Sequence, residues 1–326
     1  MNRYGRIFSV QIFGESHGLS VGIIIDGCPE GIRLNKNDFE NDLLRRKTGD
    51  FGTSPRFETD IPIIKSGVFN DFTTGSPIII EFENNDIKSE GYEKIKNIPR
   101  PGHSDFVAYK KYNGFNDYRG AGHFSGRLTI GLVGAGVIAK KIISEIDIKS
   151  KLISAGGLTN IEQAVSSAIN DADSIGGIVE CRINNVPIGL GEPFFDSIES
   201  LISHIIFSIP AVKGIEFGSG FRSAAMRGSE HNDSLINIDG KTNTNFSGGI
   251  NGGLSNGNEI VFRVAFKPTS SIPKEQISID INSGQVKKLE IIGRHDACIA
   301  LRALVIVEAA AAIALADLYL INKNYR

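Results

Sequence analysis

Residues 297–321 read ACIALRALVIVEAAAAIALADLYLI and are the longest apolar helical segment expected in this 326-residue chain. The segment is long enough for a membrane span. However, Arg302, Glu308 and Asp317 interrupt it, and alanine is frequent. These features are typical of a helix that is buried between layers of a soluble protein. The segment therefore predicts a fold built around a central helix, with no membrane as partner.

Shorter segments predict a mixed architecture around this helix. Strands are expected at Arg6–Ile12, Ser20–Asp26, Gly75–Phe82, Ile178–Ile183 and Ile260–Phe266. Helices are expected at Asn35–Lys47, Ser125–Ile146, Ile161–Asn170 and Asp196–Phe207, whereas Thr48–Thr59 and Gly91–Arg119 are expected to be largely irregular. Because we find no low-complexity linker and no repeat, we expect residues 1–326 to form a single α+β domain.

Composition excludes several classes of partner. The formal net charge is −2 and the pI is about 6.3, which gives no argument for nucleic acid. Cys28, Cys181 and Cys298 are scattered, which is typical of a reducing cytoplasm and argues against a disulfide framework or a thiolate metal site. Residues 1–6 lead into a short alternating stretch and not into a long apolar signal, so we expect a cytoplasmic protein.

Polar islands that contain glycine interrupt the apolar segments. They are Phe13–Gly18, Arg100–Asp105, Arg119–Arg127, Ser247–Gly257 and Gly293–Asp296. Four arginines stand at the edges of such breaks, namely Arg46, Arg100, Arg127 and Arg294. A lone arginine is usually solvated, but several convergent guanidinium groups suit a small polyanion, because each can hold a carboxylate or phosphate by forked hydrogen bonds. The islands therefore indicate a small acidic substrate.

Some of these motifs also have ordinary structural explanations. The spacing Gly134-x-Gly136-x-x-Ala139 matches that of a dinucleotide-binding loop. This segment, however, lies inside a predicted helix, which favours a role of its small residues in close helix packing. Asp296 precedes the C-terminal helix, and N-capping alone would explain it. The segment Lys267–Ser271 follows a strand and offers a cation, hydroxyls and amides, so it could cradle a phosphate, although it lacks Walker spacing.

Three other functions compete at this point. Gly14-x-Ser16-x-Gly18 matches the nucleophile elbow of serine hydrolases, but the elbow requires a helix after the turn and Leu19–Asp26 continues as a strand. A metal enzyme could use the six histidines, yet no His-x-x-x-His or His-Glu-x-x-His spacing occurs, so we expect no metal. A non-catalytic protein that binds flavin or another anion would leave the histidine islands without a purpose.

Taken together, the islands resemble the chorismate synthase family over nearly the whole chain. The matching segments are Phe13–Gly18, Asp42–Arg46, Ser66–Phe69, Thr73–Gly75, Arg100–Asp105, Asp117–Gly120, Ala211–Gly214, Gly228–Asp233, Gly248–Gly257, Lys267–Ser271 and Gly293–Cys298. The resemblance implies a β-α-β sandwich, with a central helical layer between antiparallel sheets, and assembly as a homotetramer. It also implies a lyase of the shikimate pathway of aromatic amino acid biosynthesis, which converts 5-enolpyruvylshikimate 3-phosphate to chorismate and phosphate by anti-1,4-elimination.

The resemblance also implies a cofactor, reduced FMN, which is not consumed overall. The substrate carries a phosphate and two carboxylates, which is the polyanion that the arginines suggest. By family position, Arg46, Arg100, Arg127 and Arg294 would meet the substrate or the flavin. The residues that would hold FMN are His123, Phe124, Ser125, Pro210, Ala211, Gly252, Lys267, Pro268, Thr269, Ser270, Ser271 and Arg294. NADPH could serve for flavin reduction, with Arg46 taking part, but the chain shows no separate flavin-reductase domain, which favours a flavin reduced elsewhere.

Three residues are then candidates for proton transfer. His17, with Ser16 beside it, would protonate the leaving phosphate. His103 would maintain the protonation state of the flavin, and Asp296 would accept or position a proton near its reactive nitrogen.

The chain also departs from the family pattern. His123, Phe124 and Leu128 stand where an arginine, a serine and an acid are usual. Gly52 stands where a basic residue is expected, and Ala297 where proline is usual. We therefore expect an active enzyme with altered anion contacts.

Overall fold

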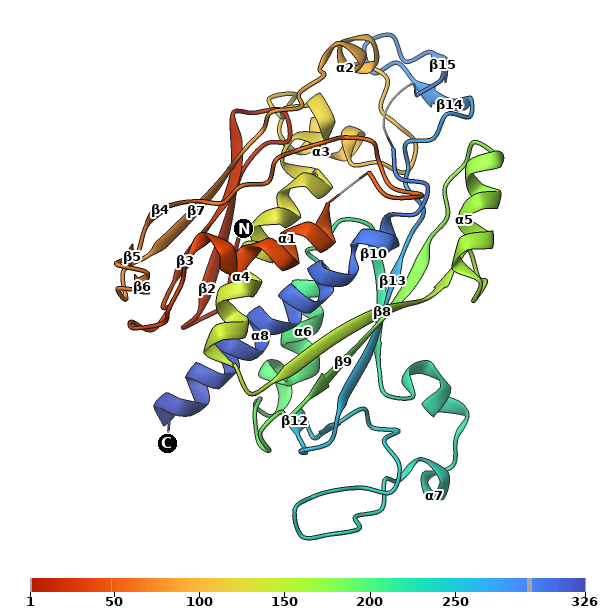
Figure 1. Cartoon of the computed structure of the whole chain (residues 1–326). Coiled ribbons are helices and arrows are strands. Elements are labelled where there is room, and N and C mark those ends of the chain that lie inside the picture. The colour runs from red at the N-terminus through yellow and green to blue at the C-terminus, as the bar shows by residue number, and fades with distance from the viewer. Residues whose placement is uncertain (1, 48, 292–294, 326) are drawn as a thin grey trace.

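Two antiparallel sheets enclose a layer of helices (Figure 1). The structure is a computed structural model that describes residues 2–47, 49–291 and 295–325. One continuous apolar core runs from Phe8 to Leu320 between the sheets. The chain therefore has the α+β sandwich with a central helical layer that the sequence predicts.

The first sheet has the strand order β1-β2-β3-β7-β4. Its strands are β1 (Arg3–Tyr4), β2 (Ser9–Gly14), β3 (Ser20–Asp26), β7 (Ile78–Glu83) and β4 (Ile63–Ser66). β3 alternates between buried Val21, Ile23 and Ile25 on one face and more exposed side chains on the other. This period of two is that of a strand with one face on the core.

The second sheet has the order β10-β13-β9-β8. These strands are β10 (Val212–Phe217), β13 (Ile260–Phe266), β9 (Gly177–Asn184) and β8 (Asp147–Ala155). Three small hairpins lie outside the sheets: β5 (Val68–Phe69) with β6 (Phe72–Thr73), β11 (Ile250–Asn251) with β12 (Leu254–Ser255), and β14 (Gln276–Ile279) with β15 (Val286–Leu289).

The helical layer consists of α1 (Glu40–Arg46), α4 (Thr129–Ile142), α6 (Ile198–Ile206) and α8 (Leu304–Tyr325). α4 packs on β3 and β7 of the first sheet, and α8 packs on β8 and β9 of the second. Shorter helices lie around this layer: α2 (Glu90–Ile95), α3 (Asp105–Lys111), α5 (Ile161–Asn170) and α7 (Gly228–His231). The 3₁₀ turns are η1 (Lys36–Phe39), η2 (Arg119–Phe124), η3 (Gly126–Leu128), η4 (Phe194–Asp196), η5 (Gly220–Ala225) and η6 (Ile299–Arg302).

Two acidic residues of α8, Glu308 and Asp317, are buried and have partners from other elements. Glu308 accepts hydrogen bonds from both terminal nitrogens of Arg45, each at 2.7 Å, and from the amide and hydroxyl of Ser150 at 2.9 Å. Asp317 accepts the backbone amides of residues 6–8 at 2.8–2.9 Å. By length and composition Leu304–Lys323 could cross a membrane, but 83% of its most apolar window is buried inside the fold. These partners make α8 a core helix, as the interruptions in its sequence predict.

Glycines allow α4 and α8 to approach closely. A Cβ at Gly136 would lie 2.4 Å from the Cβ and 2.7 Å from the Cα of Ala309, whereas a Cβ at Gly134 would meet nothing closer than 3.6 Å. The glycine pattern in this segment is therefore a helix-packing feature, as predicted.

The two glycines give a matched stability test. Gly136→Ala should lower the free energy of unfolding by about 1–3 kcal/mol, because the methyl group overpacks the contact with Ala309. Gly134→Ala adds the same methyl group in ordinary van der Waals contact, and should be neutral or stabilising by up to about 1 kcal/mol through helix propensity. Urea unfolding of both variants measures the difference, and equal effects would contradict the close packing of α4 on α8.

Several expectations about local structure need correction. The segment Gly91–Arg119 is irregular over more than half of its length, as predicted, but it also contains most of α2 and all of α3, which were not predicted. Helices of one or two turns are too short to show a helical period of apolar residues. The proline and glycine residues of this segment, which indicate loops, therefore determined the prediction. The strands β4, β8 and β10 were not predicted at all. The helix expected from Ser125 begins instead at Thr129, after the 3₁₀ turn η3, whereas Ser20–Asp26, Ile161–Asn170 and Ile260–Phe266 have the predicted bounds.

Candidate active site

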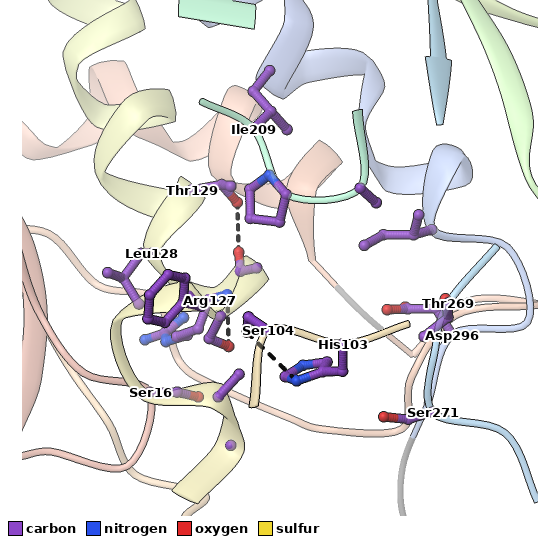
Figure 2. A pocket seen from close by; sticks show the side chains of 18 of the residues that line it. Ser16, His103, Ser104, Arg127, Leu128, Thr129, Ile209, Thr269, Ser271 and Asp296 are labelled. Carbon is purple, nitrogen blue, oxygen red and sulfur yellow. Dashed lines mark hydrogen bonds between the residues drawn. The ribbon is translucent and has the colours of Figure 1, made fainter. Parts of the chain in front are cut away.

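A cavity of about 1170 Å³ collects most of the predicted site residues (Figure 2). It lies where the turn after β2, the segment before α4, the loop after β13 and the segment before η6 meet. Among the described residues, the predicted ones that line it are Ser16, His17, Arg46, Arg100, His103, His123, Phe124, Ser125, Arg127, Pro210, Ala211, Lys267, Pro268, Thr269, Ser270, Ser271 and Asp296. Segments that are distant in the sequence therefore form one site.

The lining is strongly cationic in the part of the chain that the structure describes. It includes six arginines and five lysines against four carboxylates, which are Glu58, Asp60, Glu290 and Asp296. Ligand sites usually measure roughly 300–1,000 Å³. The cavity is therefore suited to a polyanion and has room for more than one ligand.

His17 and Ser16 occupy the turn between β2 and β3. The Nδ1 atom of His17 lies 2.8 Å from the hydroxyl of Ser89, and the ring packs edge-on against Tyr92. Ser16 is fully buried, and its Oγ accepts a hydrogen bond of 2.9 Å from Arg56. The chain turns directly from one strand into the next here, so the nucleophile elbow of a hydrolase is absent from this described segment.

His103 forms a dyad with Asp105. Its Nδ1 lies 2.7 Å from Oδ1 of Asp105, and because an ionised carboxylate only accepts, this contact assigns the proton to Nδ1. The backbone amide of Asp105 approaches the same nitrogen at 3.3 Å, a longer contact that the shorter one outweighs. Arg100 binds the same carboxylate through Nε at 2.7 Å and Nη2 at 2.9 Å. Arg100 also donates to the hydroxyl of Ser271 at 3.2 Å. Asp105 therefore holds a predicted substrate arginine and a predicted catalytic histidine in one arrangement.

Burial and the arginine decide the charge of His103. Burial lowers the pKa of His103, its hydrogen bond to the carboxylate of Asp105 raises it, and the charge of Arg100 lowers it again, so that the pKa lies below its ordinary value. Burial raises the pKa of Asp105, but the hydrogen bonds from Arg100 and His103 outweigh burial and leave it well below its usual range. His103 is therefore neutral near pH 7, with Nε2 as its proton acceptor.

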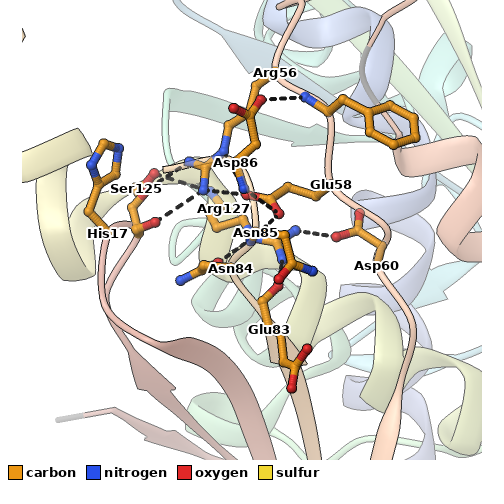
Figure 3. A network of polar contacts seen from close by, with 12 residues as sticks. His17, Arg56, Glu58, Asp60, Glu83, Asn84, Asn85, Asp86, Ser125 and Arg127 are labelled. Atoms are coloured by element: carbon orange, nitrogen blue, oxygen red, sulfur yellow. Dashed lines mark hydrogen bonds and ion pairs between the residues drawn. The ribbon is translucent and has the colours of Figure 1, made fainter. Parts of the chain in front are cut away.

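Asp60 joins two of the predicted arginines, Arg46 and Arg127, and Figure 3 shows Asp60 beside Arg127. Its carboxylate forms ion pairs with Arg127 and, at 3.4 Å, with Arg46, and all three side chains are buried. Arg127 also donates to Asn84, and Arg46 donates to the carbonyls of residues 126 and 127. Burial lowers the pKa of Arg46 to about 9, with Asp60 opposing the shift and Arg127 adding to it. These arginines are thus fixed by the protein itself at the cavity wall.

Asp296 is paired with an arginine and is not a helix cap. It accepts hydrogen bonds from Nε and Nη2 of Arg302 at 3.0 and 2.8 Å, and from the amide of Ser54 at 3.0 Å. η6 begins at Ile299 and α8 at Leu304, so the capping explanation of Asp296 is wrong. Burial raises its pKa, but the charge and hydrogen bond of Arg302 outweigh burial, and the pKa lies below its ordinary value. Asp296 is therefore ionised and can accept a proton.

The segment Lys267–Ser271 faces the cavity with polar groups. Lys267 Nζ donates to the carbonyl of Gly102 at 2.6 Å and to the hydroxyl of Ser270 at 2.8 Å. The hydroxyl of Thr269 and Nε2 of His295 are buried and have no hydrogen-bond partner, and both residues line the cavity. Unsatisfied buried polar atoms are costly. Together with the cationic lining, they fit a cofactor that carries a phosphate and ring heteroatoms.

One predicted residue, Gly252, does not line this cavity, and the placement of another is not described. Gly252 lies in the turn between β11 and β12 and is absent from the described lining. Its role in holding FMN therefore stays a prediction that its position in this chain does not support. Arg294 lies outside the described residues.

The sequence reasoning missed Arg56 and Arg302. Arg56 binds Ser16 and Glu58, and Arg302 binds Asp296, and both line the cavity. A usable signal existed for Arg302, because an arginine in an apolar helical run requires a buried partner. Arg56 had no comparable signal, since it lies in a polar loop.

The departures from the family pattern have local physical reasons. A Cβ at Gly52 would lie 2.5 Å from Val165 Cγ1 and 2.8 Å from Leu301 Cδ1, so a basic side chain does not fit there. His123 Nδ1 donates to the carbonyl of Gly14 at 2.8 Å. A neutral His123 then has no second N–H, so it does not reproduce the fork of an arginine.

Nothing in the described part of the chain favours a metal enzyme. Within residues 2–47, 49–291 and 295–325, no group of three or more His, Cys, Asp or Glu side chains is placed to hold a metal ion.

His295 predicts a pH dependence of stability. Burial, and then the charge of Arg100, lowers its pKa to about 4. The ordinary value near 6.5 applies to the unfolded chain. As the pH falls from about 6.5 to 4, the unfolded state binds a proton that the folded state does not, so stability is lost. His295→Gln should reduce the loss of stability between pH 7 and 5 in urea unfolding, and an unchanged loss would contradict the assignment.

Comparisons with known proteins agree on one family. A family model described as chorismate synthase matches residues 8–320. Chorismate synthase of Chitinophaga pinensis is 60% identical over 325 residues, covering 99% of this chain and 98% of the relative. Chorismate synthase of Pyrococcus abyssi is 44% identical, covering 98% of both. A crystal structure of chorismate synthase aligns with a TM-score of 0.73 at 26% identity, covering 99% of this chain and 93% of that one.

Proposed function

The chain belongs to the chorismate synthase family, and from this premise we propose how the residues of its cavity carry out the reaction. The reaction is the conversion of 5-enolpyruvylshikimate 3-phosphate to chorismate and phosphate by anti-1,4-elimination. A C–O bond to phosphate and a C–H bond break, and a new double bond forms. The single observation that carries the residue assignment is that His17, His103 and Asp296 line one cationic cavity.

The arginines would hold the three acidic groups of the substrate. Arg100 is fixed by Asp105 and Arg127 by Asp60, so both are oriented before the substrate arrives. Preorganised donors are worth more than mobile ones, because no reorganisation is needed during the reaction. Arg56 and Arg302 add two cations at the same cavity.

Three residues would take part in proton transfer. His17 would give a proton to the phosphate oxygen as the C–O bond breaks. Asp296 is ionised, and its carboxylate would accept or position a proton near the reactive nitrogen of the flavin as hydrogen leaves the substrate ring. His103 is neutral and would present Nε2 as an acceptor, oriented by Asp105.

Reduced FMN fits the remaining part of the lining. Lys267–Ser271, His123–Ser125 and Pro210–Ala211 would hold it, and the unpartnered Thr269 hydroxyl and His295 Nε2 would gain partners. When bound, reduced flavin supplies electron density that eases the loss of phosphate. The protein excludes water and fixes the geometry.

We further propose that the protein is cytoplasmic and that it receives its flavin already reduced. We also propose that it consists of one domain, which the single continuous core supports.

We propose, in addition, that the protein forms a homotetramer. Large exposed apolar side chains support self-association, among them Phe194, Phe195 and Phe221, which are 87–91% exposed. Analytical ultracentrifugation would test the oligomeric state, and a stable monomer would contradict it.

Anaerobic turnover tests the function. The protein, substrate and chemically reduced FMN should release phosphate, whereas oxidised FMN with NADPH should release none. No release by folded protein that still binds flavin would favour a binding protein. Rapid labelling of Ser16 by a serine-directed phosphonate would instead favour a serine hydrolase with Ser16 as its nucleophile.

A further inference from the structure

The short helix α2 is held at the cavity by contacts with site residues. α2 covers Glu90–Ile95, and none of its residues is buried. Ser89 precedes it and contacts His17, while Tyr92 contacts both His17 and Arg100. A helix without a buried face gains little from burial. These contacts therefore account for its placement beside His17.

The side chain of Ser89 is directed to His17 and not to the helix that follows. Ser89 directly precedes α2, but its backbone is helical (φ −91°, ψ −17°), whereas a serine that caps a helix usually has an extended backbone and accepts a backbone amide of the first turn. Its side chain makes no such capping bond, and Oγ instead lies 2.8 Å from Nδ1 of His17. The hydroxyl of Ser89 is therefore directed to the imidazole of His17.

The opposite edge of the imidazole faces the cavity lining. A Cβ at Gly120 would lie 2.6 Å from Nε2 of His17, and Gly120 lines the cavity with φ of +56°. Only glycine leaves room at this edge. The two nitrogens of His17 therefore have different surroundings, with Nδ1 beside Ser89 and Nε2 beside Gly120 of the cavity lining.

We propose that Ser89 and Tyr92 are positioning residues for His17, and that Ser89 ensures that the proton is released from Nε2. This inference rests on the proposed role of His17 as the acid. A protonated imidazole carries N–H on both nitrogens, so the hydroxyl of Ser89 must then accept from Nδ1. After the Nε2 proton has passed to the phosphate oxygen, the same bond retains the proton on Nδ1.

Other charges near His17 do not replace this bond. Asp117 lies close enough to interact with the charge of His17, but it is bound by Nε and Nη2 of Arg119, both at 2.9 Å. Arg56 reaches the neighbouring Ser16, and Arg100 lies 5.7 Å from the centre of the Tyr92 ring. Among these groups, the hydroxyl of Ser89 is the one that contacts Nδ1.

Kinetics of Ser89 variants test the proposal. With substrate and reduced FMN, Ser89→Ala should lower kcat about tenfold to a hundredfold, the range expected for a hydrogen bond to a charged group. The loss of turnover at high pH should begin at lower pH, because the imidazolium loses an acceptor. Ser89→Thr keeps the hydroxyl and should restore both. Tyr92→Ala should mainly raise KM through Arg100, while Tyr92→Phe keeps the ring and should not.

A control and a spectrum separate this proposal from the function itself. Glu90→Gln changes an exposed residue of the same helix outside the cavity lining, and should match wild type. In ¹⁵N-histidine-labelled enzyme without ligands, neutral His17 should carry its proton on Nδ1 in wild type and should mix tautomers in Ser89→Ala. If Ser89→Ala matches Glu90→Gln in kcat, pH profile and spectrum, the proposal is overturned. If wild-type enzyme releases no phosphate, the proposed function is wrong. The spectrum then still shows whether Ser89 holds the proton of His17 on Nδ1.

Discussion

His17→Asn should lower turnover with reduced FMN by about 10²–10⁴-fold, because loss of phosphate would proceed without a positioned acid. The effect should fall mainly on kcat, since His17 would act on the leaving group, whereas the arginines would bind the substrate.

His103→Ala should also lower turnover, because the oriented acceptor of the dyad with Asp105 would be lost. Single-turnover phosphate release under anaerobic conditions measures both variants.

The chain offers a matched control for His17. His231 also lies within hydrogen-bond distance of a serine hydroxyl, 3.0 Å from Ser219, but it lies in α7 and is absent from the described cavity lining. His231→Asn should therefore leave turnover near that of wild type. Near-native turnover of both His17→Asn and His103→Ala would show that the proton-transfer assignments are wrong.

Asp60→Asn should lower the free energy of unfolding by about 3–5 kcal/mol, because it leaves two buried guanidinium groups without their shared carboxylate. The side chains of Arg46, Arg127 and Asp60 are only 3–4% exposed, so water screens these charges weakly. Urea unfolding measures the change. The variant should also bind substrate differently, because both arginines line the cavity.

Asp71 provides the control for this substitution. Both aspartates have left-handed backbone, with φ of 55° at Asp60 and 62° at Asp71, and asparagine tolerates that conformation well. Asp71 is exposed, so Asp71→Asn should change stability by no more than about 0.5 kcal/mol. If the two variants lose equal stability, the buried ion pairs of Asp60 contribute nothing.

His17 and Asp60 have different roles in the cavity, one in the reaction and the other in stabilising the cavity wall. His17 would act on the substrate, and its loss should leave the fold intact. Asp60 holds Arg46 and Arg127 in place, so its loss should damage the wall itself. Measuring turnover and unfolding for both variants therefore distinguishes residues that react from residues that build the site.

The sequence by itself determined the architecture and the family. The apolar run before Ile321, interrupted by Glu308 and Asp317, was enough to predict a buried central helix, and both charges do have partners from other elements. Ser20–Asp26 and Ile260–Phe266 were predicted with their observed bounds. Such features are local, because burial of one face imposes a period over a few neighbouring residues.

Only the tertiary structure decided which side chains pair. Asp60 lies between Arg46 and Arg127, Arg302 binds Asp296, and Ser89 contacts His17 across 72 residues of sequence. Local sequence patterns do not predict these pairs, because an ion pair or a hydrogen bond depends on the distance between two groups in space and on their burial. For the same reason α2, with no buried face, left no period in the sequence, although it supplies two contacts to the proposed acid.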